Sequence, residues 1–198
     1  MMAGIAAYAL AWAAFGLAHS LLARENPKAW LKRHTGRWMR LVWNGIAAVQ
    51  LAAVIWVGRV AMPDPPAFDR PVWLLASQAL AGLLGLLVLW RATDSYDMRR
   101  FLGTAQLRGA EVADDEPFRV AGPLRYVRHP LYLGMILLLL AITANTRDVA
   151  TLLLATAYVL IGLRHEEAAL LRRFGAPYSA YRARVPALLP WRGRAWTG

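Results

Sequence analysis

The chain of 198 residues contains no cysteine, which excludes a disulfide framework, a thiolate metal site and a cysteine nucleophile. Acidic residues are few, with 12 Asp and Glu against 23 Lys and Arg, and the formal net charge is +11. No Gly-x-Gly-x-x-Gly motif with a strand–helix–strand pattern is present, so we do not expect a soluble dinucleotide-binding domain. Internal repeats and long soluble segments are also missing.

Apolar residues are abundant, at 58% with a mean hydropathy of +0.35, which is too apolar for an ordinary soluble domain. Five apolar runs predict five transmembrane helices in one all-α domain: Ile5–Leu22, Leu41–Met62, Val72–Trp90, Leu131–Ala144 and Val149–Leu163. The first three match the ~20 residues that cross a bilayer. The last two are shorter and flank a polar turn, which predicts an antiparallel helix hairpin whose second helix continues to Phe174.

This single membrane domain has three expected parts: three helices in residues 1–90, an interfacial connection in 91–130, and the hairpin with its tail in 131–198. We expect the first apolar run to be a membrane helix rather than a signal peptide, because no basic residue precedes it and no cleavage site follows. The acidic cluster Asp114–Glu116 predicts a solvated loop rather than a metal site, since adjacent side chains do not converge on an ion. No metal ligand set is therefore predicted.

The basic residues are unevenly distributed along the chain. Twenty of the 23 fall in segments 24–40, 91–128 and 164–198, and the other three lie at the opposite turns: Arg59, Arg70 and Arg147. By the positive-inside rule, this predicts an N-terminus outside and a C-terminus in the cytoplasm, in a bacterial inner membrane. The charge also favours contact with anionic membrane lipids. The positive charge therefore reflects the topology of the protein in the membrane rather than binding to nucleic acid.

The predicted hairpin gathers most of the unusual polar residues. Because its two helices run antiparallel, Arg128 and His129 at the start of the first should lie beside Glu166 and Glu167 near the end of the second. Pro130 suits the first helical position, which places His129 near the N-cap. A helix N-terminus attracts anionic groups, whereas the glutamates can accept hydrogen bonds from an ammonium group or from ribose hydroxyls. A ligand with an anion, a cation and a sugar would suit this pocket.

Several alternatives stay open from the residues alone. The arginines can extend to lipid headgroups, while Glu166 and Glu167 pair with Arg172 or Arg173 on their own helix. His19, one turn from the cytoplasmic end of the first helix, suits either a functional site or a hydrogen bond to a neighbouring helix.

The two motifs GPLRYVRHPLYLG and HEEAALLRRFGAPYSAYRARVPALLP resemble the C-terminal half of the isoprenylcysteine carboxyl methyltransferase-like membrane family, over residues 117–190. Relatives in that family include phospholipid N-methyltransferases and bacterial thiol S-methyltransferases. The segment FGLAHSLLAR, residues 15–24, resembles the start of the methanethiol S-methyltransferase branch. One departure is Leu124, where relatives often carry tyrosine.

The resemblance implies S-adenosylmethionine bound at the cytoplasmic end of the last two helices. The cofactor-binding residues it implies are Tyr126, His129, Tyr132, Glu166 and Glu167. The expected catalytic residues are Arg128, His129 and Glu166, with Arg128 acting on the acceptor. The expected substrate-binding residues are His19, Arg125, Arg128, Tyr178 and Tyr181.

The resemblance therefore predicts methyl transfer to a small or lipophilic acceptor: a thiol, an isoprenylcysteine-like carboxylate or a lipid amine. A thiol or amine needs a base, for which His129, His19 and Glu166 are candidates, whereas a carboxylate needs none. The motif Arg-His-Pro-x-Tyr-x-Gly also occurs in membrane sterol and steroid reductases, so an NADPH-dependent reductase is one alternative. A non-catalytic membrane accessory protein is another.

Overall fold

The computed structural model describes residues 1–108, 118–192 and 196, so the Asp114–Glu116 cluster lies outside the described residues. The described part of the chain forms helices and contains no strand, which confirms the all-α prediction. It divides into two compact units, Met1–Pro66 with Asp97–Asp114 and Ala67–Tyr96 with Asp115–Gly198.

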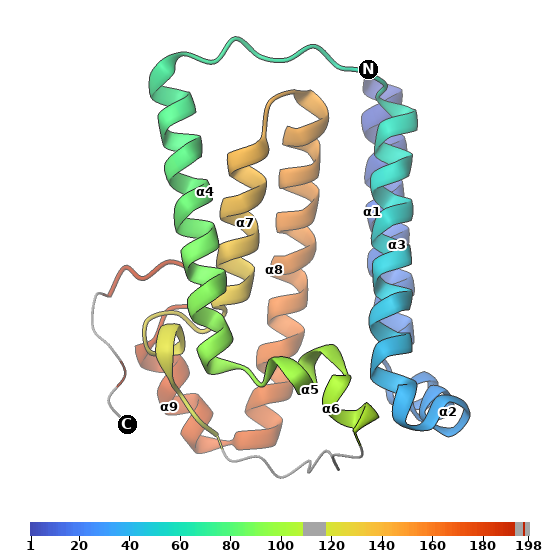
Figure 1. The fold of residues 1–198 in the computed structure, drawn as a ribbon, viewed down its shortest axis with the longest axis vertical. Coiled ribbons are helices and arrows are strands. Elements are labelled where there is room, and N and C mark those ends of the chain that lie inside the picture. The colour runs from blue at the N-terminus through green and yellow to red at the C-terminus, as the bar shows by residue number, and fades with distance from the viewer. Residues whose placement is uncertain (109–117, 193–195, 197–198) are drawn as a thin grey trace. The chain divides into compact units, whose positions relative to one another are not determined.

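The first unit is built on two long apolar helices, α1 (Met2–Leu22) and α3 (Met39–Ala61), which lie side by side in Figure 1. The close approach depends on Gly58, where a Cβ atom would lie 2.7 Å from the ring of Tyr8. The unit's remaining helices are short: α2 (Glu25–Thr35), the 3₁₀ helix η1 (Gly36–Trp38), α5 (Met98–Leu102) and α6 (Thr104–Leu107).

The second unit contains α4 (Val72–Ala92), α7 (Pro130–Ile142) and α8 (Thr146–Phe174), followed by α9 (Ala176–Arg184). Two 3₁₀ helices complete it, η2 (Thr93–Ser95) and η3 (Gly122–Arg125). Helix α7 packs against both α4 and α8, and α9 lies beyond the end of α8 (Figure 1). The predicted hairpin is therefore α7–α8, and its second helix ends at Phe174 as expected.

Glycine residues let α4 and α7 approach closely. A Cβ atom on Gly85 would lie 3.0 Å from the carbonyl oxygen of Gly134, and one on Gly134 would lie 2.6 Å from the side chain of Leu89. Such contacts leave no room for a larger residue. The small residues of α4 thus allow close packing within the protein. They bring α4 into contact with the backbone of α7 at Gly134.

Four helical segments are long and apolar enough to cross a membrane: Met2–Leu22, Glu25–Ala61, Val72–Ser95 and Thr146–Phe174. These segments define an integral membrane protein. Helix α7 occupies the position of the fifth predicted span, but its 13 residues rise only ~20 Å, less than the ~30 Å hydrocarbon core. Its crossing of the bilayer stays a prediction.

Side-chain hydrogen bonds close the hairpin at its turn. Asn145 caps α8 by accepting from the backbone N–H of Asp148, and the Asp148 carboxylate accepts from the N–H of Ala144. The buried Gln78 of α4 donates to the carbonyl oxygens of Leu140 and Thr143, at 3.3 and 2.5 Å. The Leu140 carbonyl also accepts from the backbone N–H of Thr143 at 3.3 Å, so Gln78 adds a side-chain donor at the end of the helix.

Candidate active site

The candidate active site lies where α7 begins and the last part of α8 passes beside it. Residues before α7 are held by the C-terminal segment: Arg128 N–H donates to the Pro186 carbonyl at 2.9 Å, and His129 N–H donates to Ala187 at 3.0 Å. Pro130 occupies the first helical position and His129 is the N-cap, as predicted. Both polar residues of the motif are therefore positioned by backbone contacts outside the hairpin.

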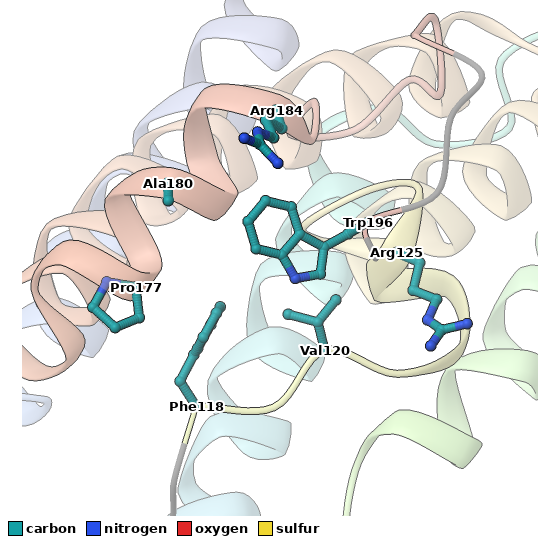
Figure 2. A pocket seen from close by; sticks show the side chains of 7 residues that line it. All are labelled: Phe118, Val120, Arg125, Pro177, Ala180, Arg184 and Trp196. Atoms are coloured by element: carbon teal, nitrogen blue, oxygen red, sulfur yellow. The ribbon is translucent and has the colours of Figure 1, made fainter. Parts of the chain in front are cut away.

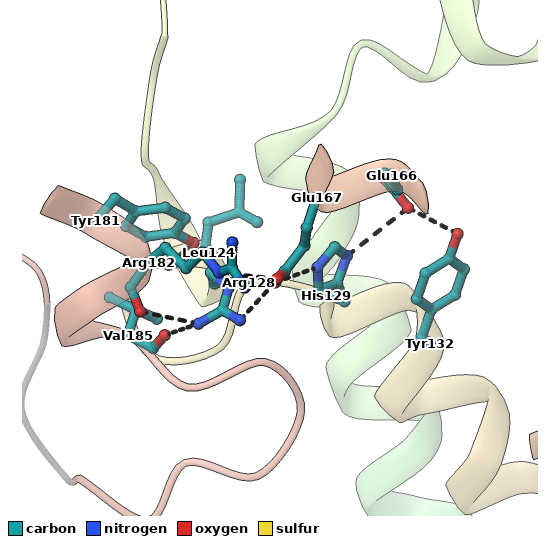
Figure 3. Close-up of polar contacts among 9 residues, drawn as sticks. All are labelled: Leu124, Arg128, His129, Tyr132, Glu166, Glu167, Tyr181, Arg182 and Val185. Carbon is teal, nitrogen blue, oxygen red and sulfur yellow. Dashed lines mark hydrogen bonds and ion pairs between the residues drawn. The ribbon is translucent and has the colours of Figure 1, made fainter. Parts of the chain in front are cut away.

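Glu167 is at the centre of a group of polar side chains, which we call the Glu167 cluster: Arg128, His129, Glu167 and Arg182. Oε1 of Glu167 accepts from Nε of Arg128 at 2.6 Å and lies 3.2 Å from Nε2 of His129 (Figure 3). Oε2 lies 3.2 Å from Nε of Arg182. The side chains of Glu167 and Arg128 are only 7% and 10% exposed, so solvent screens their ion pair weakly. Arg182 is 50% exposed, so its ion pair with Glu167 is screened more.

Arg128 is almost fully engaged inside the protein. Besides Nε, its second guanidinium nitrogen pairs with Glu167, and its third donates to the carbonyl oxygens of Arg182, at 3.1 Å, and Val185. Arg128 and His129 are adjacent in sequence, yet both side chains reach Glu167. Adjacent side chains diverge by about 100° within a helix, whereas His129 has a non-helical backbone with φ −127° and ψ 65°.

Glu166 has different surroundings from its neighbour. Its side chain is 46% exposed, and Oε2 accepts from the Tyr132 hydroxyl at 2.8 Å (Figure 3). The same oxygen lies 3.8 Å from Nδ1 of His129, whose ring stacks on Tyr132 with centroids 5.5 Å apart. The His129 ring is thus placed between the two glutamates, one on each ring nitrogen.

Tyr96, which directly follows η2, is a residue near Glu166 that the sequence motifs did not indicate. Burial, together with the nearby Glu166 charge, raises the pKa of Tyr96 to about 12. At neutral pH its hydroxyl is therefore protonated and can donate a hydrogen bond.

The two tyrosines of α9 belong to the core. Tyr178, Tyr181 and Val185 are buried together, and the Tyr181 hydroxyl donates to the Leu124 carbonyl at 2.6 Å. Phe118 and Trp196 pack edge-on against the Tyr181 ring. Contact between these tyrosines and a substrate stays a prediction.

Helix α9 also borders a pocket of about 590 Å³. It is lined by Phe118, Val120, Arg125, Pro177, Ala180, Arg184 and Trp196 (Figure 2). Arg125 thus lines this pocket. The next residue, Tyr126, is about half exposed. His19 belongs to the first unit, where its ring packs between Phe15 and Trp43, so its role in substrate binding also stays a prediction.

Arg182 and the carbonyl oxygen of Val185 contact the site but were not predicted from the sequence. The available signal was helical spacing, because Arg182 follows Tyr178 by four positions and precedes Val185, which ends α9, by three. The ion pairs described for Glu167 go to Arg128 and Arg182, which join it to other elements rather than to its own helix. Within the described residues, no three metal-ligating side chains form a metal site.

These observations define a class of protein: an all-α integral membrane protein with a His–Glu site at the open end of a helix hairpin. The chain is 34% identical to methanethiol S-methyltransferase 2 of Bradyrhizobium diazoefficiens, covering 89% of this chain and 69% of the relative. It is 30% identical to methanethiol S-methyltransferase 1 of the same organism, covering 92% and 66%, and 30% identical to the Crocosphaera subtropica methanethiol S-methyltransferase, covering 91% and 72%.

The chain belongs to the methanethiol S-methyltransferase family. The resemblance to the wider isoprenylcysteine carboxyl methyltransferase-like family is thereby confirmed. No family model and no solved structure matches the chain.

Proposed function

We propose that this protein transfers a methyl group from S-adenosylmethionine to a small thiol at the hairpin site. The observation that carries the proposal is the His129 ring held between two carboxylates, at 3.2 Å from Glu167 and 3.8 Å from Glu166. The names of the relatives support a thiol acceptor over a carboxylate or a lipid amine.

Glu166 and the first turn of α7 suit the methyl donor. The half-exposed Glu166 carboxylate can accept hydrogen bonds from an ammonium group or ribose hydroxyls, and Tyr132 holds it at 2.8 Å. The N–H groups of Leu131 and Tyr132 have no acceptor within the helix, so they favour a carboxylate. Tyr126 and His129 complete the set that we assign to the donor. When bound, S-adenosylmethionine would supply a methyl group activated on a sulfonium: the acceptor sulfur would bond to the methyl carbon as its bond to the sulfonium breaks, and S-adenosylhomocysteine would leave, with no redox change.

His129 is the base that we assign to the thiol. If the Glu167 carboxylate accepts the Nε2 proton, the lone pair of Nδ1 is left on the side of Glu166 and can take the thiol proton. The resulting thiolate is the nucleophile, and the buried setting limits competing reaction with water. We assign Arg128 to holding Glu167, because its nitrogens are engaged within the protein.

We also propose that the protein lies in a bacterial inner membrane with its N-terminus outside and its C-terminus in the cytoplasm. The uneven distribution of Lys and Arg supports this orientation. It gives the hairpin site access to cytoplasmic S-adenosylmethionine.

The test uses purified full-length protein in detergent. We expect methyl transfer from S-adenosylmethionine to methanethiol, and no transfer to an isoprenylcysteine carboxylate or to a lipid amine. Calorimetric titration should show binding of S-adenosylmethionine but not of NADPH. Binding of NADPH alone would favour the reductase, and binding of neither would favour the accessory protein.

A further inference from the structure

Arg182 is the described partner of the second oxygen of Glu167. Nε of Arg182 lies 3.2 Å from Oε2, while Arg128 and His129 share Oε1. A carboxylate held at one oxygen can still rotate about its terminal torsion, which is broad in energy. A second contact at the other oxygen restricts that rotation. The position of Oε1 beside His129 therefore depends on Arg182 as well as on Arg128.

Helix α9 holds Arg182 in place from both sides. Gly175, with φ +58°, ends α8 and lets the chain turn into α9. Tyr181, next to Arg182, is buried and donates from its hydroxyl to the Leu124 carbonyl. The carbonyl oxygen of Arg182 accepts from Arg128 at 3.1 Å. Arg182 thus contacts the Glu167 cluster through its backbone and its side chain (Figure 3).

The two arginines of the Glu167 cluster differ in burial. The Arg128 side chain is 10% exposed, and its removal would leave Glu167 without its main buried partner. The Arg182 side chain is 50% exposed, so its removal opens little space in the core. A substitution at Arg182 can therefore change the orientation of Glu167 while the fold stays intact.

We propose that Arg182 is a positioning residue for thiol deprotonation: by holding Oε2 of Glu167, it keeps Oε1 on Nε2 of His129 and so keeps Nδ1 directed to the acceptor. This inference rests on the proposed function and deepens it. Arg182 touches neither donor nor acceptor in this role. Its effect should appear only where the acceptor has to lose a proton.

The test compares two acceptors with Arg182→Gln, Arg182→Lys and the control Arg184→Gln, all in the full-length protein. Arg184 lies on the same helix but is directed to the ring of Trp196, with 5.4 Å between the guanidinium carbon and the ring centroid. One acceptor is an alkyl thiol, which is mostly protonated at neutral pH, and the other is an acidic aryl thiol, which is already ionised. The turnover number, the affinity for S-adenosylmethionine and the melting temperature are measured for each variant.

We expect Arg182→Gln to lower turnover of the alkyl thiol about tenfold, a part of the roughly 10²–10⁴-fold that a positioned base contributes. Turnover of the aryl thiol and donor affinity should match wild type, and Arg182→Lys should recover part of the loss because it keeps the charge but not the planar fork. Arg184→Gln should behave as wild type with both acceptors.

Equal losses on both thiols, or no loss relative to Arg184→Gln, would overturn the role of Arg182 while the proposed function stands. If Arg182→Gln lowers the melting temperature strongly, Arg182→Lys decides the question by the same comparison of acceptors. Failure of the wild-type protein to methylate either thiol would overturn the proposed function, and the inference with it.

Discussion

At the scale of single residues, the two adjacent glutamates of α8 have different surroundings. Glu167 is buried among Arg128, His129 and Arg182, whereas Glu166 is half exposed beside Tyr132. A buried ion pair contributes little relative to apolar packing, but loss of one partner leaves an uncompensated charge in the interior. Substitutions at the two positions should therefore have different consequences.

For stability, we expect Glu167→Ala to destabilise the protein by ~3–5 kcal/mol, because Arg128 would be left buried without a carboxylate. Glu166→Ala should cost only about 0–1 kcal/mol, as is typical of exposed pairs. Thermal unfolding in detergent checks both values. Equal melting temperatures for the two variants would contradict the central position of Glu167.

For donor binding, we expect Glu166→Gln to weaken the affinity for S-adenosylmethionine by about tenfold or more, since a hydrogen bond to a charged group contributes ~1.5–3 kcal/mol. Calorimetric titration of the folded variant measures the change. Arg184→Gln is the control, because Arg184 lines the pocket that α9 borders. An unchanged affinity would remove Glu166 from the donor site.

At high pH, the burial of Tyr178 determines how the stability of the folded state changes with pH. Burial, reinforced by the charge of Glu167 and opposed by that of Arg128, raises the pKa of Tyr178 from 10.0 to about 12. The folded state favours the neutral phenol, so this stabilisation is complete below pH 10 and is lost as the pH rises toward 12. Unfolding measured from pH 9 to 12 should show a steeper loss in wild type than in Tyr178→Phe. If the free energy of unfolding falls equally steeply with pH in both proteins, the raised pKa of Tyr178 is contradicted.

At the scale of the helices, the contact between α4 and α7 determines the position of the start of α7. Gly134 is one turn into α7, and its backbone rests on Gly85 and Leu89 of α4. Because α7 starts at Pro130, a displacement of this contact would also move His129 and Tyr132. Packing within the membrane helices and geometry of the site are therefore coupled.

We expect Gly134→Ala to destabilise the protein by about 1–3 kcal/mol, as overpacking does, because the new Cβ atom would lie 2.6 Å from Leu89. The control is Gly162→Ala on α8, where nothing lies within 4 Å of a new Cβ atom. Since alanine forms helix better than glycine, Gly162→Ala should be neutral or slightly stabilising. Thermal unfolding compares the two, and a neutral Gly134→Ala would argue against the close contact.

At the scale of the whole molecule, the described helices fit an integral membrane protein, and 20 of the 23 Lys and Arg fall in segments 24–40, 91–128 and 164–198. Reporter fusions at Pro65 and after Gly198 should therefore report opposite compartments, outside for Pro65 and cytoplasm for the C-terminus. The result depends on whether α7 crosses the bilayer with its 13 residues. The same compartment for both fusions would show that α7 and α8 do not form two spans.

The amino-acid sequence by itself determined the local features of this protein. Apolar runs predicted the five helices, since length and hydropathy are properties of a segment alone. Pro130 predicted the start of α7, and the polar turn predicted the hairpin that brings His129 to the glutamates. Membership of the methanethiol S-methyltransferase family also follows from the amino-acid sequence alone, because it rests on sequence identity.

Only the tertiary structure decided which of the two glutamates is buried and where Arg128 points. Neighbouring positions on a helix differ by about 100°, so Glu166 and Glu167 cannot be told apart until α7 and α9 are packed beside them. Arg128 lies at a bend outside the helices, and its direction is determined by hydrogen bonds to Pro186 and Val185 far along the sequence. Arg182 reaches Glu167 only because Gly175 turns the chain between them. Contacts of this kind depend on distances between segments, and a linear pattern does not contain them.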